Sequence, residues 1–386
     1  MLSIVKNEKT AIFWLCSAHL VCDVYSGFVN PLMPFIASKI GFSMAVATVL
    51  VAITQVCSNM LQPLFGFLAD NNLKRFFIFW GLILSSLFIP LAPCSPNLYI
   101  LTLCLILGCL GGSFFHPQSM GFVNYFSGKN CSNNMGVFVS LGSLGFAFGP
   151  LIAAYITQVA GLEKMFLTSL IGIFLALIMF FFVPKLSDKE SVKKQGFIIS
   201  FKDILSNSQM QLLMIISMMK TLVTSSSCIL LPFLWKSMGY SPFYIGLALF
   251  LFVFAGSIGS FLSPKFEKFF GAKPVLYFSM WASLPLLYVF SVTYKAMPIF
   301  SLFVFAIIGF TTMLAQPVTL VWAQKILPQY KSIVAGFING FCWGAIAIVI
   351  SCLGTIAERF GITNVLIVLA IFPVLTSVSI KRLKNR

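Results

Sequence analysis

Four ionisable residues, His19, Asp23, His116 and Lys220, lie deep inside long apolar stretches of the sequence. If those stretches span a membrane, a charge at their centre costs about 2.5–3.5 kcal/mol even on the lenient insertion scale, so such residues usually face a wet cavity and serve transport. His19 and Asp23 are four residues apart, so they share one face of a helix and can exchange a proton. We therefore predict that Asp23 couples transport to protons, with His19 and His116 as its proton-carrying neighbours.

Each of these residues also has a purely structural explanation. Asp23 could bond to backbone groups that Asn30-Pro31 opens, and His19 could merely orient Asp23. His116 precedes Pro117, so its ring could bond to backbone that the proline leaves unpaired.

Lys220 lies near the middle of the seventh apolar stretch, about 16 Å from its start at about 1.5 Å per residue. We predict that it binds an anionic substrate group or pairs with Asp23 across a central cavity. The alternative is that its side chain extends along the helix to the membrane interface. Gln118, beside His116, is the one uncharged polar residue that we predict to contact substrate, together with Asp23; the other polar residues in the spans are more often contacts between helices.

The composition supports the membrane setting of these residues. The chain has 386 residues, of which 59% are hydrophobic and 9% charged, and its mean hydropathy is +0.99. A span needs about 20 apolar residues, so the length allows roughly a dozen spans and leaves no room for a soluble domain. We predict an all-α integral membrane protein with twelve transmembrane helices in two pseudo-symmetric six-helix bundles. The candidate spans are 11–36, 44–69, 76–92, 98–122, 134–159, 165–183, 209–235, 244–261, 274–292, 298–323, 333–356 and 364–380. The first run continues past signal-peptide length without a cleavage site, which predicts a retained helix.

The basic residues indicate the orientation of these helices. Most of the 25 Lys and Arg residues fall on the side that the two termini share, and five fall on the opposite side: Lys39, Lys164, Lys236, Lys295 and Arg359. This asymmetry predicts cytoplasmic termini and accounts for the net charge of +16 without nucleic-acid binding. The ten cysteines form no CxxC pair, so we predict neither disulfides nor a metal site, and no cofactor.

A short internal repeat divides the chain. Pro34-Phe35 and Gly41-Phe42-Ser43 recur at one offset as Pro232-Phe233 and Gly239-Tyr240-Ser241. Two equivalent halves would leave such a trace. We predict an N-terminal bundle over 1–184, a cytoplasmic linker over 185–208 and a C-terminal bundle over 209–386.

Several motifs give the chain a specific resemblance. Gly66-Phe-Leu-Ala-Asp70 followed by Lys74-Arg75, and Gly145-x-x-x-Gly149-Pro150, resemble motifs of the major facilitator superfamily. Within it, His19-Leu20-x-x-Asp23, Leu61-Gln62-Pro63, Phe115-His116-Pro117 and Lys220 resemble the fosmidomycin-resistance branch of efflux proteins.

This resemblance implies a proton-driven exporter that works by alternating access, with a cavity lined by helices 1, 4, 7 and 10. Asp70, Lys74 and Arg75, with Gly66, would form a cytoplasmic gate. The motif of Gly145, Gly149 and Pro150 is similar to the one typical of antiporters. The branch usually has Glu after its His-Pro pair, whereas this chain has Gln118, so one titratable group is missing from helix 4.

The predicted function is therefore secondary transport, as a proton antiporter that exports a small compound or drug, with anionic compounds as one candidate class. The predicted partners are this small molecule, protons and the lipid bilayer, and the predicted form is a monomer in the bacterial inner membrane. Proton-coupled import uses the same fold and stays an alternative. A membrane-embedded enzyme is less favoured because no GxSxG motif or carboxylate-rich metal site is present, and a channel is less favoured because no filter-like loop is visible.

Overall fold

A computed structural model describes residues 8–65, 76–128, 131–184, 197–328 and 331–384. The described residues contain twelve helical segments long and apolar enough to cross a membrane, so the predicted number of spans and the all-α fold are confirmed. The chain forms two compact units, and unit 1 comprises residues 1–40 and 57–194. Unit 2 comprises residues 41–56 and 195–386. The predicted bundle boundaries at 184 and 209 stay a prediction.

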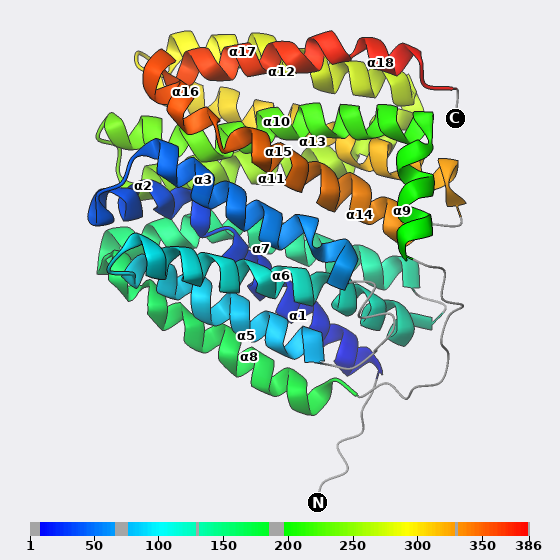
Figure 1. Ribbon diagram of the computed structural model, residues 1–386, viewed down its shortest axis with the longest axis horizontal. Helices are drawn as coiled ribbons and strands as arrows, with labels where there is room; N and C mark the ends of the chain where they lie inside the picture. The colour runs from blue at the N-terminus through cyan, green and yellow to red at the C-terminus, as the bar shows by residue number, and fades with distance from the viewer. Residues whose placement is uncertain (1–7, 66–75, 129–130, 185–196, 329–330, 385–386) are drawn as a thin grey trace, which may run out of the picture. The chain divides into compact units, whose positions relative to one another are not determined.

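Unit 1 contains the first, third, fourth, fifth and sixth spans. Its elements are α1 (Glu8–Ser26), α2 (Val29–Ile40), the π-helix η1 (Val56–Met60), α5 (Phe76–Leu91), the 3-10 helix η2 (Ala92–Cys94), α6 (Leu98–Ser127), α7 (Cys131–Ala160), the 3-10 helix η4 (Leu162–Thr168) and α8 (Ser169–Phe182). The π-helix straddles the unit boundary, with Val56 on the other side. In Figure 1, α5, α6 and α8 run in similar directions, and α1 packs against α5, α6, α7 and α8. The unit is therefore organised around α1.

The first span is broken where α1 meets α2. Pro31 has no backbone N–H to donate, and residues 27 and 28 form a turn between the two helices. The core beside α1 is apolar and includes Leu15, Phe115 and Phe138, each of which is fully buried.

Unit 2 contains α3 and the second half of the chain. Its elements are α3 (Met44–Gln55), α9 (Phe197–Ser206), α10 (Ser208–Ser237), α11 (Pro242–Phe270), α12 (Ala272–Thr293), α13 (Pro298–Ile326), α14 (Lys331–Gly336), the π-helix η6 (Phe337–Phe341), α15 (Cys342–Ile350), α16 (Leu353–Phe360), α17 (Ile362–Thr376) and α18 (Val378–Lys381). The helix α3 packs against α15 and α16. Glu358 of α16 accepts a hydrogen bond from the Ala45 N–H in the first turn of α3, at 2.9 Å. The span that follows the first loop is thus held to unit 2 by both packing and capping.

A short helix, α9, lies in the stretch predicted only as a polar linker, and stands at a steep angle to α10 in Figure 1. Ile204 is fully buried in the core of unit 2, and the Phe201 ring lies 4.9 Å from that of Phe337. The α9 sequence itself, FIISFKDILS, is amphipathic, and burial of its apolar side chains explains why it is helical within a longer stretch that is polar on average.

The two copies of the sequence repeat adopt the same local structure. Gly41 and Gly239 have φ of 87° and 82°, the left-handed conformation that glycine adopts without steric cost. Two residues later, Ser43 and Ser241 cap α3 and α11 by accepting hydrogen bonds from Val46 N and Tyr244 N. The repeat therefore encodes a turn and a helix start at matching places in the two halves of the sequence.

Candidate functional site

The structure brings together three of the four ionisable residues that the sequence singles out. His19 and Asp23 lie on α1 and His116 lies on α6. His19 Nε2 is 3.2 Å from Asp23 Oδ2, and His116 Nε2 is 3.4 Å from Asp23 Oδ1. The side chains are 6%, 15% and 15% exposed for His19, Asp23 and His116. A mostly buried carboxylate thus lies between two imidazoles, a group that we call the Asp23 cluster.

A third helix, α7, orients His19. The Nδ1 atom of His19 lies 2.8 Å from the carbonyl oxygen of Phe138, and the Phe138 ring stacks on the imidazole at 4.0 Å with an interplanar angle of 21°. Phe138 is fully buried. The imidazole is therefore held by a bond to the backbone on one side and by the carboxylate on the other, and it has little freedom to rotate.

Gly142 of α7 leaves the space that the cluster occupies. A Cβ atom at this position would lie 2.3 Å from His19 Cε1, 2.5 Å from His19 Nε2 and 2.7 Å from Asp23 Oδ2. No real Cβ makes contacts this short, so any larger residue would displace the pair. The spacing of glycines in α7 is visible in the sequence, but which of them borders the cluster, and the role of the Phe138 carbonyl, is not.

The predicted helix 5 motif keeps the backbones of α1 and α7 close together. A Cβ at Gly145 would lie 2.1 Å from the Leu20 carbonyl oxygen, and one at Gly149 would lie 2.4 Å from that of Val24. Pro150 lies against the turn that follows α1, because its Cδ would lie 2.9 Å from a Cβ at Gly27. These contacts give Gly145, Gly149 and Pro150 a packing role beside the cluster, and the antiporter role of the motif stays a prediction.

The Asp23 cluster also has a donor set that a metal ion could use, because its three ligand atoms lie within 4.8 Å of one another. Each imidazole nitrogen nevertheless faces a different carboxylate oxygen at close to hydrogen-bonding distance. Direct sharing of protons explains this arrangement without an ion, and we interpret the cluster in that way.

Lys220 lies in α10 of unit 2 and is 4% exposed. Within that unit, no carboxylate that the structure describes forms an ion pair with it. Its charge lies near the Cys342 thiol of α15, and Thr221, one residue away, has a buried hydroxyl without a hydrogen-bond partner among the residues that the structure describes. Lys220 and Asp23 belong to different units, so their predicted pairing stays a prediction.

A comparison with known families decides the identity of the fold. Residues 15–351 match the Major Facilitator Superfamily. The chain belongs to this superfamily. The predicted resemblance is thereby confirmed at the level of the family.

Two curated members of the superfamily are similar along nearly the whole chain. The Uncharacterized MFS-type transporter YfnC of Bacillus subtilis (strain 168) is 24% identical over 374 residues, which are 92% of this chain and 88% of the relative. The Fosmidomycin resistance protein of Escherichia coli (strain K12) is 25% identical over 376 residues, 96% of this chain and 91% of the relative. The second similarity agrees with the branch that the sequence motifs indicate.

A solved structure shows the same fold at lower identity. The nucleoside transporter NupG, as its D323A mutant, superposes with a TM-score of 0.78 at 15% identity, covering 98% of this chain and 100% of that chain. The chain is therefore a multi-pass membrane protein of the Major Facilitator Superfamily, a secondary transporter that handles small molecules in the bilayer.

The structure does not show Gln118 or the predicted gate residues of this transporter in the roles predicted for them. Gln118 is 1% exposed, and its Oε1 accepts a hydrogen bond from the Ile78 N–H in the first turn of α5, at 3.0 Å. Its observed role is helix packing, and contact with substrate stays a prediction. The predicted gate residues lie outside the described residues: Gly66, Asp70, Lys74 and Arg75.

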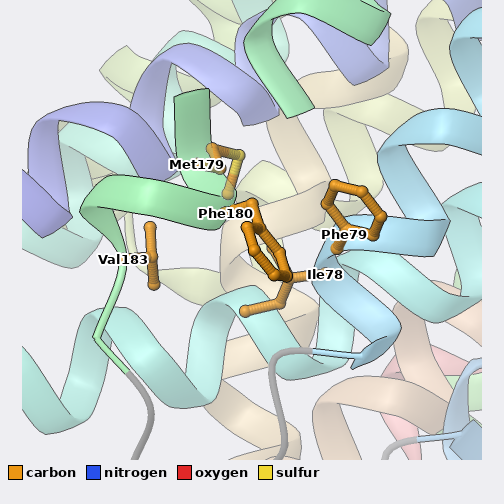
Figure 2. A pocket seen from close by; sticks show the side chains of 5 residues that line it. All are labelled: Ile78, Phe79, Met179, Phe180 and Val183. Carbon is orange, nitrogen blue, oxygen red and sulfur yellow. The ribbon is translucent and has the colours of Figure 1, made fainter. Parts of the chain in front are cut away.

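A small pocket lies between α5 and α8, and Figure 2 shows the side chains of Ile78, Phe79, Met179, Phe180 and Val183 around it. All five are apolar, and Phe180 is 50% exposed on the outer surface. The pocket has no group that could orient a polar substrate, so it does not contribute to the transport site.

Proposed function

We propose that this transporter exchanges protons for a small anionic compound and exports that compound from the cytoplasm. The observation that carries the proposal is the Asp23 cluster, a carboxylate held between His19 and His116 in the first and fourth spans. Burying an unpaired carboxylate in a membrane span is costly, whereas a protonated or imidazolium-paired carboxylate is tolerated. Binding and release of a proton at Asp23 therefore changes the energy of any conformation that closes water off from it.

Lys220 is the proposed anion-binding residue. A buried ammonium group is tolerated when an opposite charge accompanies it, and within unit 2 no described carboxylate supplies one. A substrate carboxylate or phosphonate would supply the charge and accept strong hydrogen bonds from Nζ. The proposed substrate is consequently an anion.

The membrane orientation, the location and the oligomeric state of the transporter are further parts of the proposal. Cytoplasmic termini follow from the basic residues on the side that the termini share, and this bias is typical of inner-membrane proteins. Opening and closing on the cytoplasmic side is assigned to Gly66, Asp70, Lys74 and Arg75, by resemblance to the superfamily motif. A single chain is proposed to act alone, because α1 and α6 of one chain supply every residue of the Asp23 cluster and α7 of the same chain packs against it.

The proposed direction is export, since the similar protein of Escherichia coli is named for resistance to fosmidomycin. Fosmidomycin, an anion at neutral pH, is the first compound to test. Purified protein in liposomes with a pH gradient across the membrane should accumulate it on the more acidic side, in exchange for protons that flow down their gradient to the other side. Movement in the same direction as protons would instead establish import by symport.

The coupling role of Asp23 is tested by Asp23→Asn, which keeps the size of the side chain but cannot release a proton. Counterflow without a pH gradient should persist in this variant, while gradient-driven accumulation is lost. Asp203→Asn, on the exposed surface of α9, is the matched control and should transport as the wild type does. Undiminished uphill transport by Asp23→Asn would remove Asp23 from the coupling step.

A further inference from the structure

The contact between His19 and Phe138 determines where the His19 ring carries hydrogen. A backbone carbonyl oxygen can only accept a hydrogen bond, and His19 Nδ1 lies 2.8 Å from the Phe138 oxygen. The Nδ1 atom must therefore be the protonated one. In a neutral imidazole this leaves Nε2 as an acceptor with a lone pair.

The consequence appears on the other side of the ring. Nε2 lies 3.2 Å from Asp23 Oδ2, and an ionised carboxylate is also only an acceptor. Two lone pairs at this distance repel each other, so the observed geometry requires one proton between the two atoms. That proton either makes His19 an imidazolium or protonates Asp23, and the number of bound protons is the same.

Release of this proton to water disrupts one of the two contacts of the His19 ring, either the one with Asp23 or the one with the Phe138 oxygen. If His19 keeps hydrogen on Nδ1, Nε2 and the Asp23 carboxylate repel each other. If the hydrogen moves to Nε2, the Nδ1 lone pair faces the Phe138 oxygen. Asp23 would then be held by the Nε2–H of His116, which lies 3.4 Å from Oδ1.

We propose that α7 is a positioning element for the proton, and that the Phe138 carbonyl and Gly142 make close packing of α1 on α7 conditional on one proton bound between His19 and Asp23. This inference rests on the proposed proton coupling. Gly142 is needed because only glycine leaves room for the pair against α7. Linkage is reciprocal: separation of α7 from α1 favours loss of the proton, and loss of the proton favours separation.

The other titratable groups around the cluster do not change this argument. Cys22 on α1 and Cys109 on α6 are thiols that interact electrostatically with one another, and Cys22 also with Asp23. The sequences of α5, α7 and α8 contain no His, Asp, Glu, Lys or Arg. The described charges that face His19 are therefore those of Asp23 and His116.

The number of histidines makes a direct test possible, because the chain has only two and both belong to the cluster. Nitrogen NMR of the full-length protein, labelled with 15N-histidine and held in lipid nanodiscs, reports the hydrogen on each ring nitrogen. We expect one histidine, assigned as His19 by its loss in His19→Gln, to carry hydrogen on Nδ1 at every pH at which the proton between His19 and Asp23 is bound. In that proton-bound state, a His19 ring with hydrogen on Nε2 alone would overturn the inference, whether or not transport depends on protons.

The role of α7 is tested by Gly142→Ala, with Gly136→Ala as its matched control on the same helix. A Cβ at Gly136 would have no atom within 4 Å. In Gly142→Ala, His19 loses acceptors that favour its protonated form, so its proton affinity in the same NMR titration should fall about tenfold or more. Gly136→Ala should titrate as the wild type does, and equal midpoints for all three proteins would overturn the role of α7.

Two further results keep the inference separate from the proposed function. Phe138→Leu retains the backbone carbonyl, so hydrogen should stay on Nδ1 of His19 although the stacked ring is gone. If Gly142→Ala does not fold, a changed tautomer in Phe138→Leu would by itself contradict the assignment to the carbonyl. If the tautomer is as expected but fosmidomycin or other anions move without protons, the proposed function fails and the assignment of the proton stands.

Discussion

The Asp23 cluster in unit 1 and Lys220 in unit 2 tolerate an ionisable group inside a membrane span in different ways. Asp23 has His19 and His116 within 3.4 Å, and α7 fixes the His19 ring. Lys220 is more deeply buried, yet no described carboxylate of its own unit pairs with it, and three hydroxyls on the same helix lack partners: those of Thr221, Ser226 and Ser227. Asp23 therefore has its hydrogen-bonding partners within its own unit, whereas Lys220 has no carboxylate partner among the described residues of its unit.

This difference suggests a division of work between the two halves. A site with all its partners in place needs only a proton to change its charge, so it suits coupling. A buried cation that has no carboxylate partner among the described residues of its own unit suits a ligand that brings the missing charge. The following predictions test whether the two groups are in fact separable.

The largest effect is expected from Asp23→Asn. Gradient-driven accumulation should be abolished, because Asn cannot bind and release a proton, while binding of an anion at Lys220 should remain. Equilibrium binding of fosmidomycin, measured by calorimetry in detergent, gives the second quantity. Loss of both accumulation and binding in a folded variant would show that the two groups form one site and would break the comparison.

A smaller effect is expected from Lys220→Ala. Affinity for the anionic compound should fall about 10- to 100-fold, the range expected when a charged hydrogen-bonding partner is lost. Lys220→Arg should recover only part of this loss, because the guanidinium is larger and planar. The control is Lys236→Ala in the last turn of the same helix.

Transport rates measured over a range of substrate concentrations and pH values distinguish this role from that of a lysine whose side chain merely extends towards the membrane interface. If Lys220 binds the anion, the transport rates of Lys220→Ala and wild type should differ most at low substrate concentration. Superimposable rates and pH profiles would remove Lys220 from the mechanism.

The sequence predicted most of the fold because its signals are local. Runs of apolar residues predicted twelve spans, and the Gly41 and Gly239 repeats predicted equivalent segments that the structure shows to be turns and helix caps. The helix α9 was missed because the polar residues of the longer 184–208 stretch obscured its short amphipathic sequence, and because the sequence does not show that Ile204 packs against distant residues.

The candidate site was predicted less completely. Spacing placed His19 and Asp23 on one helix face, but contact with His116 depends on how α6 packs against α1. Gln118 was predicted to bind substrate, and its oxygen is used by the Ile78 N–H. A backbone carbonyl such as that of Phe138 has no signature in sequence, since every residue has one.

Two glycines with matching contacts provide a third test of the comparison. A Cβ at Gly145 of α7 would lie 2.1 Å from the Leu20 oxygen, and one at Gly309 of α13 would lie 2.1 Å from the Phe252 oxygen. Gly145→Ala and Gly309→Ala should each lower the free energy of unfolding by about 1–3 kcal/mol, the usual cost of overpacking. Thermal unfolding in detergent measures this cost.

The proton affinity of His19 distinguishes these two variants. Gly145→Ala moves α1 relative to α7 and should lower the proton affinity of His19, whereas Gly309→Ala should leave it unchanged. A shift of the same size in both variants would mean that the cluster responds to general destabilisation and not to the packing of α1 on α7.

The smallest effect is expected from the two serines that cap helices at the matching repeats. Ser43→Ala and Ser241→Ala each remove an acceptor for a backbone N–H in the first turn, so each should lower the free energy of unfolding by about 1 kcal/mol. The start of α3 has an additional acceptor, since Glu358 Oε1 accepts a hydrogen bond from the Ala45 N–H. At the start of α11, the Ser241 hydroxyl accepts a hydrogen bond from the Tyr244 N–H. Ser43→Ala should therefore be the milder of the two variants, and adding Glu358→Ala to it should cost more than the sum of the two separate losses. Chemical unfolding of the three variants beside Ser241→Ala measures these differences, and equal losses for Ser43→Ala with and without Glu358 would show that the carboxylate does not hold α3 to α16.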